Sequence, residues 1–155
     1  NSVAQGAQNA EITVKVRGTY LCMEGPAFST RAESQLYRSW GLDIIGMTNA
    51  TEAKLFREAE ICYATIALVT DYDCWHQSEA PVTVDMIIEN LSRNNENAQR
   101  ILKETVKLLP EDRDCTCHYA LKDALITQPD SIPQSTREKL ALIIGHYLPE
   151  KSKTE

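Results

Sequence analysis

The sequence predicts an α/β fold, and three features of the chain support this prediction. Its 155 residues are enough for one domain with a hydrophobic core. From Gly18 to Thr70 the expected elements alternate as strand, helix, strand, helix, strand, which is the order of βαβ units with parallel strands. Residues 62 to 70, CYATIALVT, carry no charge and are rich in β-branched side chains. Such a run is typical of a strand that is buried on both faces.

The first part of this pattern contains a strand unit and a helix. Residues 11 to 24 alternate in polarity and then become apolar, which predicts two short strands or one bent pair that ends at Gly25-Pro26. Thr30 and Glu33 have the spacing of a capping box, so we expect a helix from there to Gly41. The apolar face of this helix is expected to consist of Ala32, Leu36 and Trp40.

The next elements complete the alternation and then lead into a long helix. Residues 43 to 48 predict a short strand, and Thr51 can cap the helix that follows it. The strand at 61 to 70 comes directly afterwards. Thr83 is expected to begin a long or kinked helix, because apolar residues recur with helical spacing until shortly before Pro110.

The carboxyl-terminal part of the chain is expected to be helical and irregular. A loop with the sequence Cys-Thr-Cys-His leads into a short helix predicted at 119 to 126. A last helix is expected at 134 to 147, and residues 149 to 155 are expected to form a frayed tail. The inward side of that last helix is expected to consist of Leu140, Ile143, Ile144 and Tyr147.

Composition and charge exclude several classes of protein. The chain is 43% hydrophobic and 25% charged, which is typical of a globular domain, and its net charge of −6 argues against nucleic acid or an anionic membrane as a partner. No apolar run approaches the roughly 20 residues that span a bilayer, and no signal peptide is recognised. Five cysteines, an odd number, favour a reducing compartment, so the expected location is the cytoplasm.

Asp71 and Asp73 follow the expected strand at 61 to 70, and they are the leading candidates for chemistry. Open α/β sheets bind ligands at the carboxyl ends of their strands. Between Arg57 and Arg93 there is no Lys or Arg, so a site around Asp71 would be acidic and would suit a ligand that donates hydrogen bonds or accepts a proton. The alternative is that the two Asp residues only start a turn.

Two further stretches could contact a ligand. In the first, Gly25-Pro26 fixes a turn before Phe28 and Ser29, whose ring could stack on a planar molecule and whose hydroxyl could bond its edge. The alternative is a helix cap with a core Phe. In the second, Met47 follows a glycine and offers a soft apolar surface, although a simple turn at the strand end fits as well.

A metal site is only weakly indicated by the candidate set Cys74, His76, Cys115, Cys117 and His118. Structural zinc usually requires Cys-x₂₋₄-Cys pairs, and the Cys115-Thr116-Cys117 spacing is too tight for that pattern. A Cys115–Cys117 disulfide or plain thiols are better interpretations, and no metal is predicted. A nucleophilic pair of Cys117 with His146 is conceivable but has no support in the sequence. No glycine-rich phosphate loop occurs.

Three segments carry a resemblance to a known family: EGPAFSTRAES, IGMTNATEAKLFREAEICYATIALVTDYDCWH and the later CTCH. They resemble the carboxyl-terminal half of 5′-methylthioadenosine phosphorylases, which belong to the trimeric purine nucleoside phosphorylase family. The resemblance implies that residues 1 to 155 form the carboxyl-terminal part of a single domain. It also implies a three-layer fold with a mixed, mostly parallel central sheet flanked by helices. In this family the amino-terminal half holds the phosphate loop and an Arg–His cluster.

The resemblance implies roles for five residues around the purine base. Phe28 corresponds to the residue that packs on purine and ribose, and Ser29 occupies the position at which enzymes for 6-oxopurines carry Glu. Thr70 is expected to line the base pocket. Asp71 corresponds to the residue that faces purine N7 and the 6-amino group, where 6-oxopurine enzymes carry Asn. Asp73 is expected to support that amino group.

The resemblance implies five further contacts with the rest of the substrate. Met47 corresponds to the methionine that contacts the ribose, and Thr48 to the neighbour that reaches phosphate and sugar. The apolar wall for the 5′-alkylthio group is expected to consist of Val84, Ile87 and Ile88. A nucleoside and phosphate are thus the expected partners. The resemblance implies a homotrimer and no cofactor, with phosphate as a co-substrate.

The implied reaction is the phosphate-dependent cleavage of 5′-methylthioadenosine into adenine and 5-methylthioribose 1-phosphate. Adenine leaves more easily if N7 is protonated as the glycosidic bond breaks, and Asp71 could supply that proton whereas an Asn could not. A broader purine nucleoside phosphorylase that accepts adenosine or inosine is one alternative. A non-catalytic nucleoside-binding remnant without the phosphate half is the other.

Overall fold

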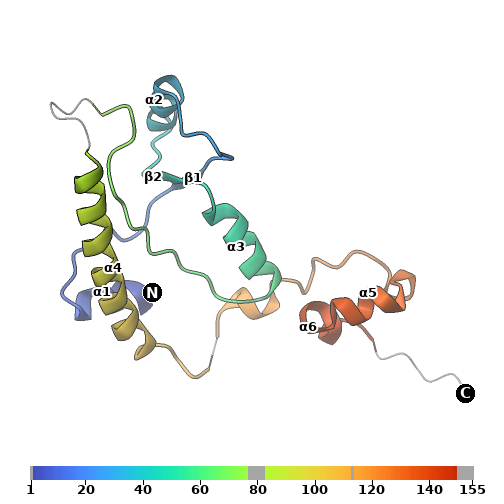
Figure 1. Cartoon of the computed structure of the whole chain (residues 1–155). Coiled ribbons are helices and arrows are strands. Elements are labelled where there is room, and N and C mark those ends of the chain that lie inside the picture. The colour runs from blue at the N-terminus through green and yellow to red at the C-terminus, as the bar shows by residue number, and fades with distance from the viewer. Residues whose placement is uncertain (1, 77–82, 113, 150–155) are drawn as a thin grey trace, which may run out of the picture. The chain divides into compact units, whose positions relative to one another are not determined.

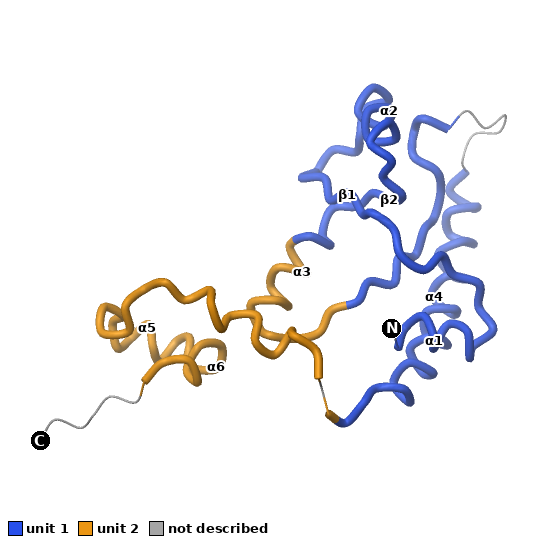
Figure 2. Tube along the Cα trace, turned by 180° about the vertical axis from the view of Figure 1, so that it is seen from behind, with its two compact units in different colours: residues 1–50, 64–111 blue, residues 51–63, 112–155 orange. Residues whose placement is uncertain are grey.

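The computed structural model describes residues 2–76, 83–112 and 114–149 and contains two compact units (Figures 1 and 2). Unit 1 comprises residues 1–50 and 64–111, and unit 2 comprises residues 51–63 and 112–155. The boundary between them falls within helix α3 (Asn49–Glu58). α3 begins two residues before Thr51, which was expected to cap it. In the described part of the chain, none of the helices has both the length and the apolar character that crossing a bilayer requires.

Unit 1 contains one βαβ unit, as the sequence predicts. Strand β1 (Tyr20–Cys22) pairs in parallel with β2 (Ile44–Gly46), with Tyr20 opposite Ile44. The loop before β2 is fixed by Asp43, whose carboxylate accepts hydrogen bonds from the backbone N–H of Thr19 at 2.7 Å and from Lys15. These bonds, the one from Lys15 foremost, lower the pKa of Asp43. Only β1 is regular within 11–24, so the two strands or bent pair expected there are reduced to one short strand.

Helix α2 (Arg31–Ser39) connects the two strands and has the predicted capping box. Thr30 Oγ1 accepts from the Glu33 N–H at 3.3 Å, and the Glu33 carboxylate accepts from the Thr30 N–H at 2.7 Å. The Thr30 N–H, and after it the Thr30 hydroxyl, donate to the Glu33 carboxylate and hold its pKa below the usual value. The helix ends before Gly41, whose φ of +74° favours glycine. The apolar face predicted from Ala32, Leu36 and Trp40 is exposed, and Ser34 is the buried residue of the helix.

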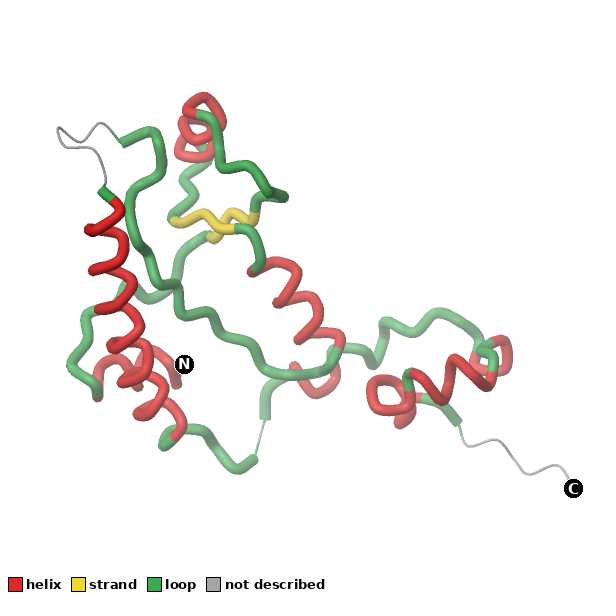
Figure 3. Tube along the Cα trace, viewed as in Figure 1, coloured by secondary structure: helices red, strands yellow, loops and turns green. Residues whose placement is uncertain are grey.

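The strand expected at residues 61–70 is not formed, and Figure 3 shows this stretch as loop. A strand needs a neighbour that satisfies its backbone hydrogen bonds. Here the carbonyls of Val69 and Thr70 accept instead from the side chains of Asn94 and Asn90. Leu68 and Val69 are exposed, so the prediction of burial on both faces is also wrong. The sheet of the described residues therefore has two strands rather than the larger mixed sheet that was expected.

The best-packed part of unit 1 is the contact between α1 (Ser2–Asn9) and α4 (Val84–Val106), which lie side by side (Figure 1). Ala7 and Ile101 are buried there. A Cβ at Gly6 would lie 2.9 Å from the backbone nitrogen of Thr105, so only glycine allows this approach. The sequence did not predict α1, because its residues are mostly polar or small. It did predict α4, which begins after the Thr83 cap and ends before Pro110.

The carboxyl-terminal helices of unit 2 are shorter than expected. The helix predicted at 119–126 is replaced by the 3₁₀ turn η1 (Thr116–Tyr119) and further turns, and a second 3₁₀ turn, η2, spans Pro129–Ser131. The helix predicted at 134–147 is divided into α5 (Gln134–Lys139), α6 (Ala141–Ile144) and η3 (Gly145–Tyr147).

The division falls where the backbone of Leu140 leaves helical geometry, with φ of −101° and ψ of 9°. The β-branched residues and the glycine that follow have low helix propensity. The predicted inward residues are confirmed, because Ile144 is buried and Leu140, Ile143 and Tyr147 are half-buried. Apart from Pro149, the frayed tail predicted at 149–155 lies outside the described residues.

Candidate functional site

The residues predicted to bind the nucleoside all belong to unit 1. Because β1 and β2 are parallel, the loops that follow them begin at the same edge of the sheet. These loops carry Phe28 and Ser29 after β1, and Met47 and Thr48 after β2. Met47 packs against the turn before Phe28: its Sδ lies 2.7 Å from the position that a Cβ at Gly25 would take. The φ of +69° favours glycine at position 25, and a Cβ there would also displace the Met47 side chain.

Ser29 connects this pair of loops to the Asp71 segment. The Ser29 hydroxyl donates to the sulfur of Met23 at 3.6 Å, which turns it toward the end of β1. The Ser29 carbonyl accepts from the Cys74 thiol at 3.5 Å, although 45 positions separate the two residues. The approach of Met47 to Gly25 and the bond between Cys74 and Ser29 thus connect the β1–α2 loop with the end of β2 and with the segment after Thr70. That these parts form one nucleoside site stays a prediction.

Helix α4 also binds the segment that leads to Asp71. The side-chain amide of Asn90 donates to the Thr70 carbonyl at 2.8 Å, and that of Asn94 donates to the Val69 carbonyl at 2.7 Å. The Thr70 hydroxyl donates in turn to a carboxylate oxygen of Asp71. Sequence reasoning missed Asn90 and Asn94. The available signal was their spacing of four, which places both on the helix face that also carries Ile87.

Asp73 and its neighbours form a turn, which agrees with the alternative considered for this residue. Its carboxylate accepts from the Cys74 N–H at 2.8 Å, and its carbonyl accepts from the His76 N–H at 3.0 Å. The turn also places Trp75 against α2, where the Arg38 guanidinium lies 3.7 Å from the ring centroid. This cation–π contact was not anticipated, because its partners are far apart in sequence.

The apolar parts of the predicted site are open. Phe28 is 87% exposed and Val84 is 71% exposed. Ile88 is also exposed, and only Ile87 is half-buried, so the apolar wall predicted for the alkylthio group is not enclosed by the described residues. A cavity of about 680 Å³ in unit 1 lies elsewhere, beside α1 and Leu108, and none of the predicted site residues line it.

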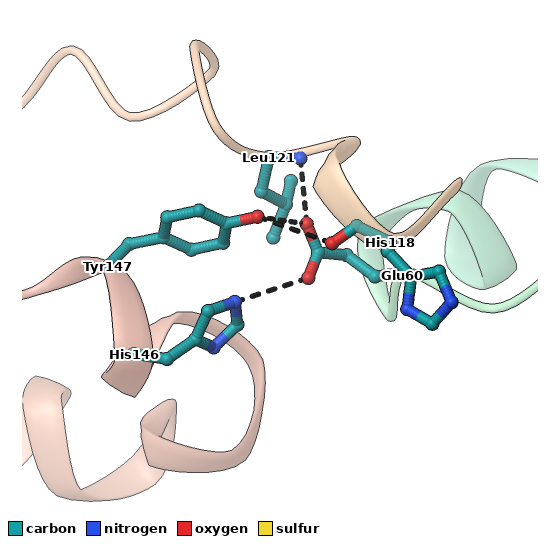
Figure 4. A network of polar contacts seen from close by, with 5 residues as sticks. All are labelled: Glu60, His118, Leu121, His146 and Tyr147. Atoms are coloured by element: carbon teal, nitrogen blue, oxygen red, sulfur yellow. Dashed lines mark hydrogen bonds and ion pairs between the residues drawn. The ribbon is translucent and has the colours of Figure 1, made fainter. Parts of the chain in front are cut away.

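Unit 2 contains a polar network around Glu60 that the sequence did not reveal (Figure 4). The Glu60 carboxylate accepts from the Tyr147 hydroxyl, from the Leu121 N–H at 3.0 Å and from His146 Nε2 at 3.3 Å. Its side chain is only 12% exposed. The hydrogen bond from Tyr147 lowers the pKa of Glu60 and raises that of Tyr147 to about 12. His146, considered above as a base for Cys117, therefore contacts Glu60.

Three thiols gather near this network. All five cysteines are free, so the expectation of plain thiols is confirmed and the Cys115–Cys117 disulfide is not formed. The Sγ atoms of Cys62, Cys115 and Cys117 lie within 4.8 Å of one another. The contact with the Cys62 thiol lowers the pKa of Cys115, and the contact with Cys115 raises that of Cys117.

Comparison with protein families gives one result for this chain. Residues 1–107, more than half of the chain, match the phosphorylase superfamily. The chain belongs to this superfamily. The match includes every residue predicted to contact the nucleoside, and it ends just after α4.

Individual curated proteins give a more specific match than the superfamily does. The S-methyl-5′-thioadenosine phosphorylase of Gloeobacter violaceus is 60% identical over 149 residues, which are 93% of this chain and 50% of that protein. The protein of the same name from Koribacter versatilis is 56% identical over 96% of this chain and 51% of its own length. The chain thus spans about half the length of the curated relatives it matches.

Solved structures of similar proteins have a similar backbone. A methylthioadenosine phosphorylase from an antarctic soil metagenomic library matches with a TM-score of 0.83 and 46% identity over 92% of this chain and 51% of that one. The methylthioadenosine phosphorylase of Schistosoma mansoni in complex with adenine matches with a TM-score of 0.66 and 35% identity, over 78% of this chain and 48% of that one. The superfamily fold is therefore present in the described residues, although only two of its strands are formed.

Proposed function

We propose that this chain provides the base- and alkylthio-binding part of a 5′-methylthioadenosine phosphorylase. The proposal is carried by the 56–60% identity to proteins of that name over 93–96% of the chain. The reaction is the phosphate-dependent cleavage of 5′-methylthioadenosine to adenine and 5-methylthioribose 1-phosphate, which is a pentosyl transfer that serves purine and methionine salvage.

In this proposal Asp71 is the acid that assists the departure of adenine. It faces N7 of the purine and donates a proton as the glycosidic bond breaks, so the negative charge that develops on the base is neutralised. The hydroxyl of Thr70, which donates to the Asp71 carboxylate, orients the acid. Asn90 keeps this pair in place from α4, because it binds the carbonyl of Thr70. Asp73 stabilises the turn and supports the 6-amino group.

The loops after β1 and β2 provide the remaining contacts. Phe28 stacks on the purine, and its exposure leaves the ring free to do so. Ser29 leaves room for an amino group, and Met47 and Thr48 contact ribose and phosphate. In this proposal Ile87 forms one side of the alkylthio pocket together with Val84 and Ile88. The exposure of these apolar side chains supports a pocket that is closed by parts of the protein beyond the described residues.

We further propose that the complete domain is a three-layer nucleoside phosphorylase fold with a mixed, mostly parallel sheet. Residues 61–70 then pair with neighbouring strands, because the uncharged side chains that are exposed in unit 1 suit burial on both faces. The protein is proposed to form a homotrimer that needs no cofactor. Five free thiols support a reducing location, and we propose the cytoplasm.

The experiment that tests this function is an adenine-release assay. The purified protein is incubated with 5′-methylthioadenosine, with and without phosphate, and adenine is measured by chromatography. We expect release only when phosphate is present. Binding of the nucleoside without cleavage would favour the non-catalytic alternative, and equal rates with inosine would favour a broader purine nucleoside phosphorylase.

A further inference from the structure

The thiol cluster of unit 2 consists of Cys62, Cys115 and Cys117 and lies outside the proposed nucleoside site. Cys62 follows α3, whereas Cys115 and Cys117 belong to the start of η1, more than 50 positions later. The three Sγ atoms lie within 4.8 Å of one another, and those of Cys62 and Cys115 are 3.1 Å apart. Three free thiols from two separate segments therefore converge on one point.

The Glu60 network explains why these segments meet. Glu60 stands two residues before Cys62, and its carboxylate accepts from the Leu121 N–H at 3.0 Å. Leu121 follows η1 closely, so this bond ties the end of α3 to the segment that carries Cys115 and Cys117. Tyr147 donates both to Glu60 and, at 3.5 Å, to the carbonyl of His118, which is the residue next to Cys117 (Figure 4). The thiols are thus held in place by bonds that do not involve sulfur.

We propose that these three thiols bind one soft, thiol-preferring metal ion, with Zn²⁺ as the expected occupant. Tetrahedral zinc with Zn–S bonds of about 2.3 Å places its sulfur ligands about 3.8 Å apart. The Cys62–Cys115 spacing of 3.1 Å is shorter than that value and no pair is more than 4.8 Å apart, so side-chain shifts of about 1 Å suffice to bind zinc. The thiols lose their protons as the Zn–S bonds form, and binding releases these protons to the solvent.

His118 is the candidate for the fourth ligand. Its Nε2 is buried and has no hydrogen-bond partner among the described residues, which is unusual for a buried polar atom. The imidazole is not within the 4.8 Å group, and in Figure 4 its ring points away from the Glu60 carboxylate. A rotation toward the thiols would complete a Cys₃His set, which is a common structural zinc site. The sequence gave only a weak signal because Cys-x-Cys is tighter than the usual zinc pattern and because the third thiol, Cys62, comes from a distant segment.

The test measures metal binding by the protein in the presence of a thiol-free reductant. After chelator treatment, Zn²⁺ is titrated in competition with a chromophoric chelator, and Cd²⁺ is titrated while the sulfur-to-metal charge-transfer absorption is followed. We expect one ion per chain for either metal, with proton release in the zinc titration. Cys62→Ser and Cys117→Ser are each expected to weaken zinc binding by more than ~100-fold, because changes outside the ligand set already cost about 10- to 100-fold.

Cys74→Ser provides the matched control, since Cys74 is an exposed free thiol outside the cluster. It is expected to keep full affinity and the full cadmium absorption. His118→Gln is expected to weaken zinc binding and to retain the cadmium–sulfur absorption, because the thiols remain. Circular dichroism verifies that each variant is folded. If one of Cys62→Ser and Cys117→Ser does not fold, the other is sufficient for the test. The proposal is overturned if the reduced protein binds no zinc, or if Cys74→Ser weakens binding as much as Cys62→Ser does.

Discussion

Glu60 in unit 2 and Asp71 in unit 1 are carboxylates with opposite surroundings. Glu60 is 12% exposed and accepts from three groups, Tyr147, His146 and the Leu121 N–H. Asp71 is exposed, and its hydrogen bond in the described part of the chain comes from the adjacent Thr70 hydroxyl. The acceptor positions of Glu60 are thus occupied by the protein, whereas those of Asp71 are available to a ligand. The comparison separates a carboxylate that holds structure together from one suited to chemistry.

Asp71→Asn has the largest expected effect, and it tests whether Asp71 is the carboxylate that takes part in the chemistry. The Asn can accept a hydrogen bond but cannot donate the proton, so kcat/KM for 5′-methylthioadenosine should fall by ~10²–10⁴-fold. Because 6-oxopurine enzymes resembling this chain use Asn here, preference should shift toward inosine. The measurement is the ratio of kcat/KM values for the two nucleosides in competition. Asp130→Asn, on the exposed surface of η2, is the control and should leave the ratio unchanged. An unaltered ratio in Asp71→Asn would remove Asp71 from the mechanism.

Ser29→Glu tests the loop that contacts the Asp71 segment. A second carboxylate near the base should repel Asp71 and occupy the space of the 6-amino group, so kcat/KM for 5′-methylthioadenosine should fall by about 10-fold or more. The bond between the Ser29 carbonyl and Cys74 is made by the backbone and should persist. Ser29→Ala is the matched variant, with a much smaller expected effect. Equal activity of the Glu and Ala variants would show that position 29 does not face the base.

Asn90→Ala tests whether α4 positions Asp71, because it removes the bond to the Thr70 carbonyl without altering the acid itself. The lost hydrogen bond to the Thr70 carbonyl contributes about 1 kcal/mol. We expect a modest loss of stability and a fall in kcat that exceeds any change in KM, since the acid is less well positioned. Asn95→Ala is the control on the exposed side of α4. Should both variants behave alike, α4 would have no part in positioning Asp71.

The elements that local signals determine were predictable from the sequence. The capping box of Thr30 and Glu33, the stop at Gly41 and the long helix that begins after Thr83 all form as expected. Each depends on residues within a few positions of one another. The assignment of Ser29, Met47 and Asp71 to one site rests on family resemblance and stays a prediction, since the chain pattern alone left turns and caps as alternatives.

The features that depend on distant partners were not predictable. The apolar run at 61–70 indicated a buried strand, but a strand forms only where a neighbouring strand satisfies its backbone N–H and C=O groups. Here asparagines of α4 donate to two of the carbonyls instead. Glu60 gave no signal, because its partners Leu121, His146 and Tyr147 follow 61 or more positions later. The third thiol of the cluster was missed for the same reason.

Tyr147→Phe has the smallest expected effect and tests the structural side of the comparison. The hydrogen bond stabilises the ionised Glu60, whose pKa is lowered, so its contribution is present above the ordinary pKa of 4.5 and is lost as the pH falls further. The pKa of Tyr147 is raised to about 12, so its contribution is complete below the ordinary value of 10.0 and is lost as the pH rises toward 12. Urea unfolding across the pH range should show wild type more stable than Tyr147→Phe between these limits, with the difference disappearing on either side. Tyr119→Phe, which alters an exposed ring, should show no such window. A stability difference that is independent of pH would mean that the Tyr147 ring, rather than its bond to the carboxylate, holds this part of unit 2 together.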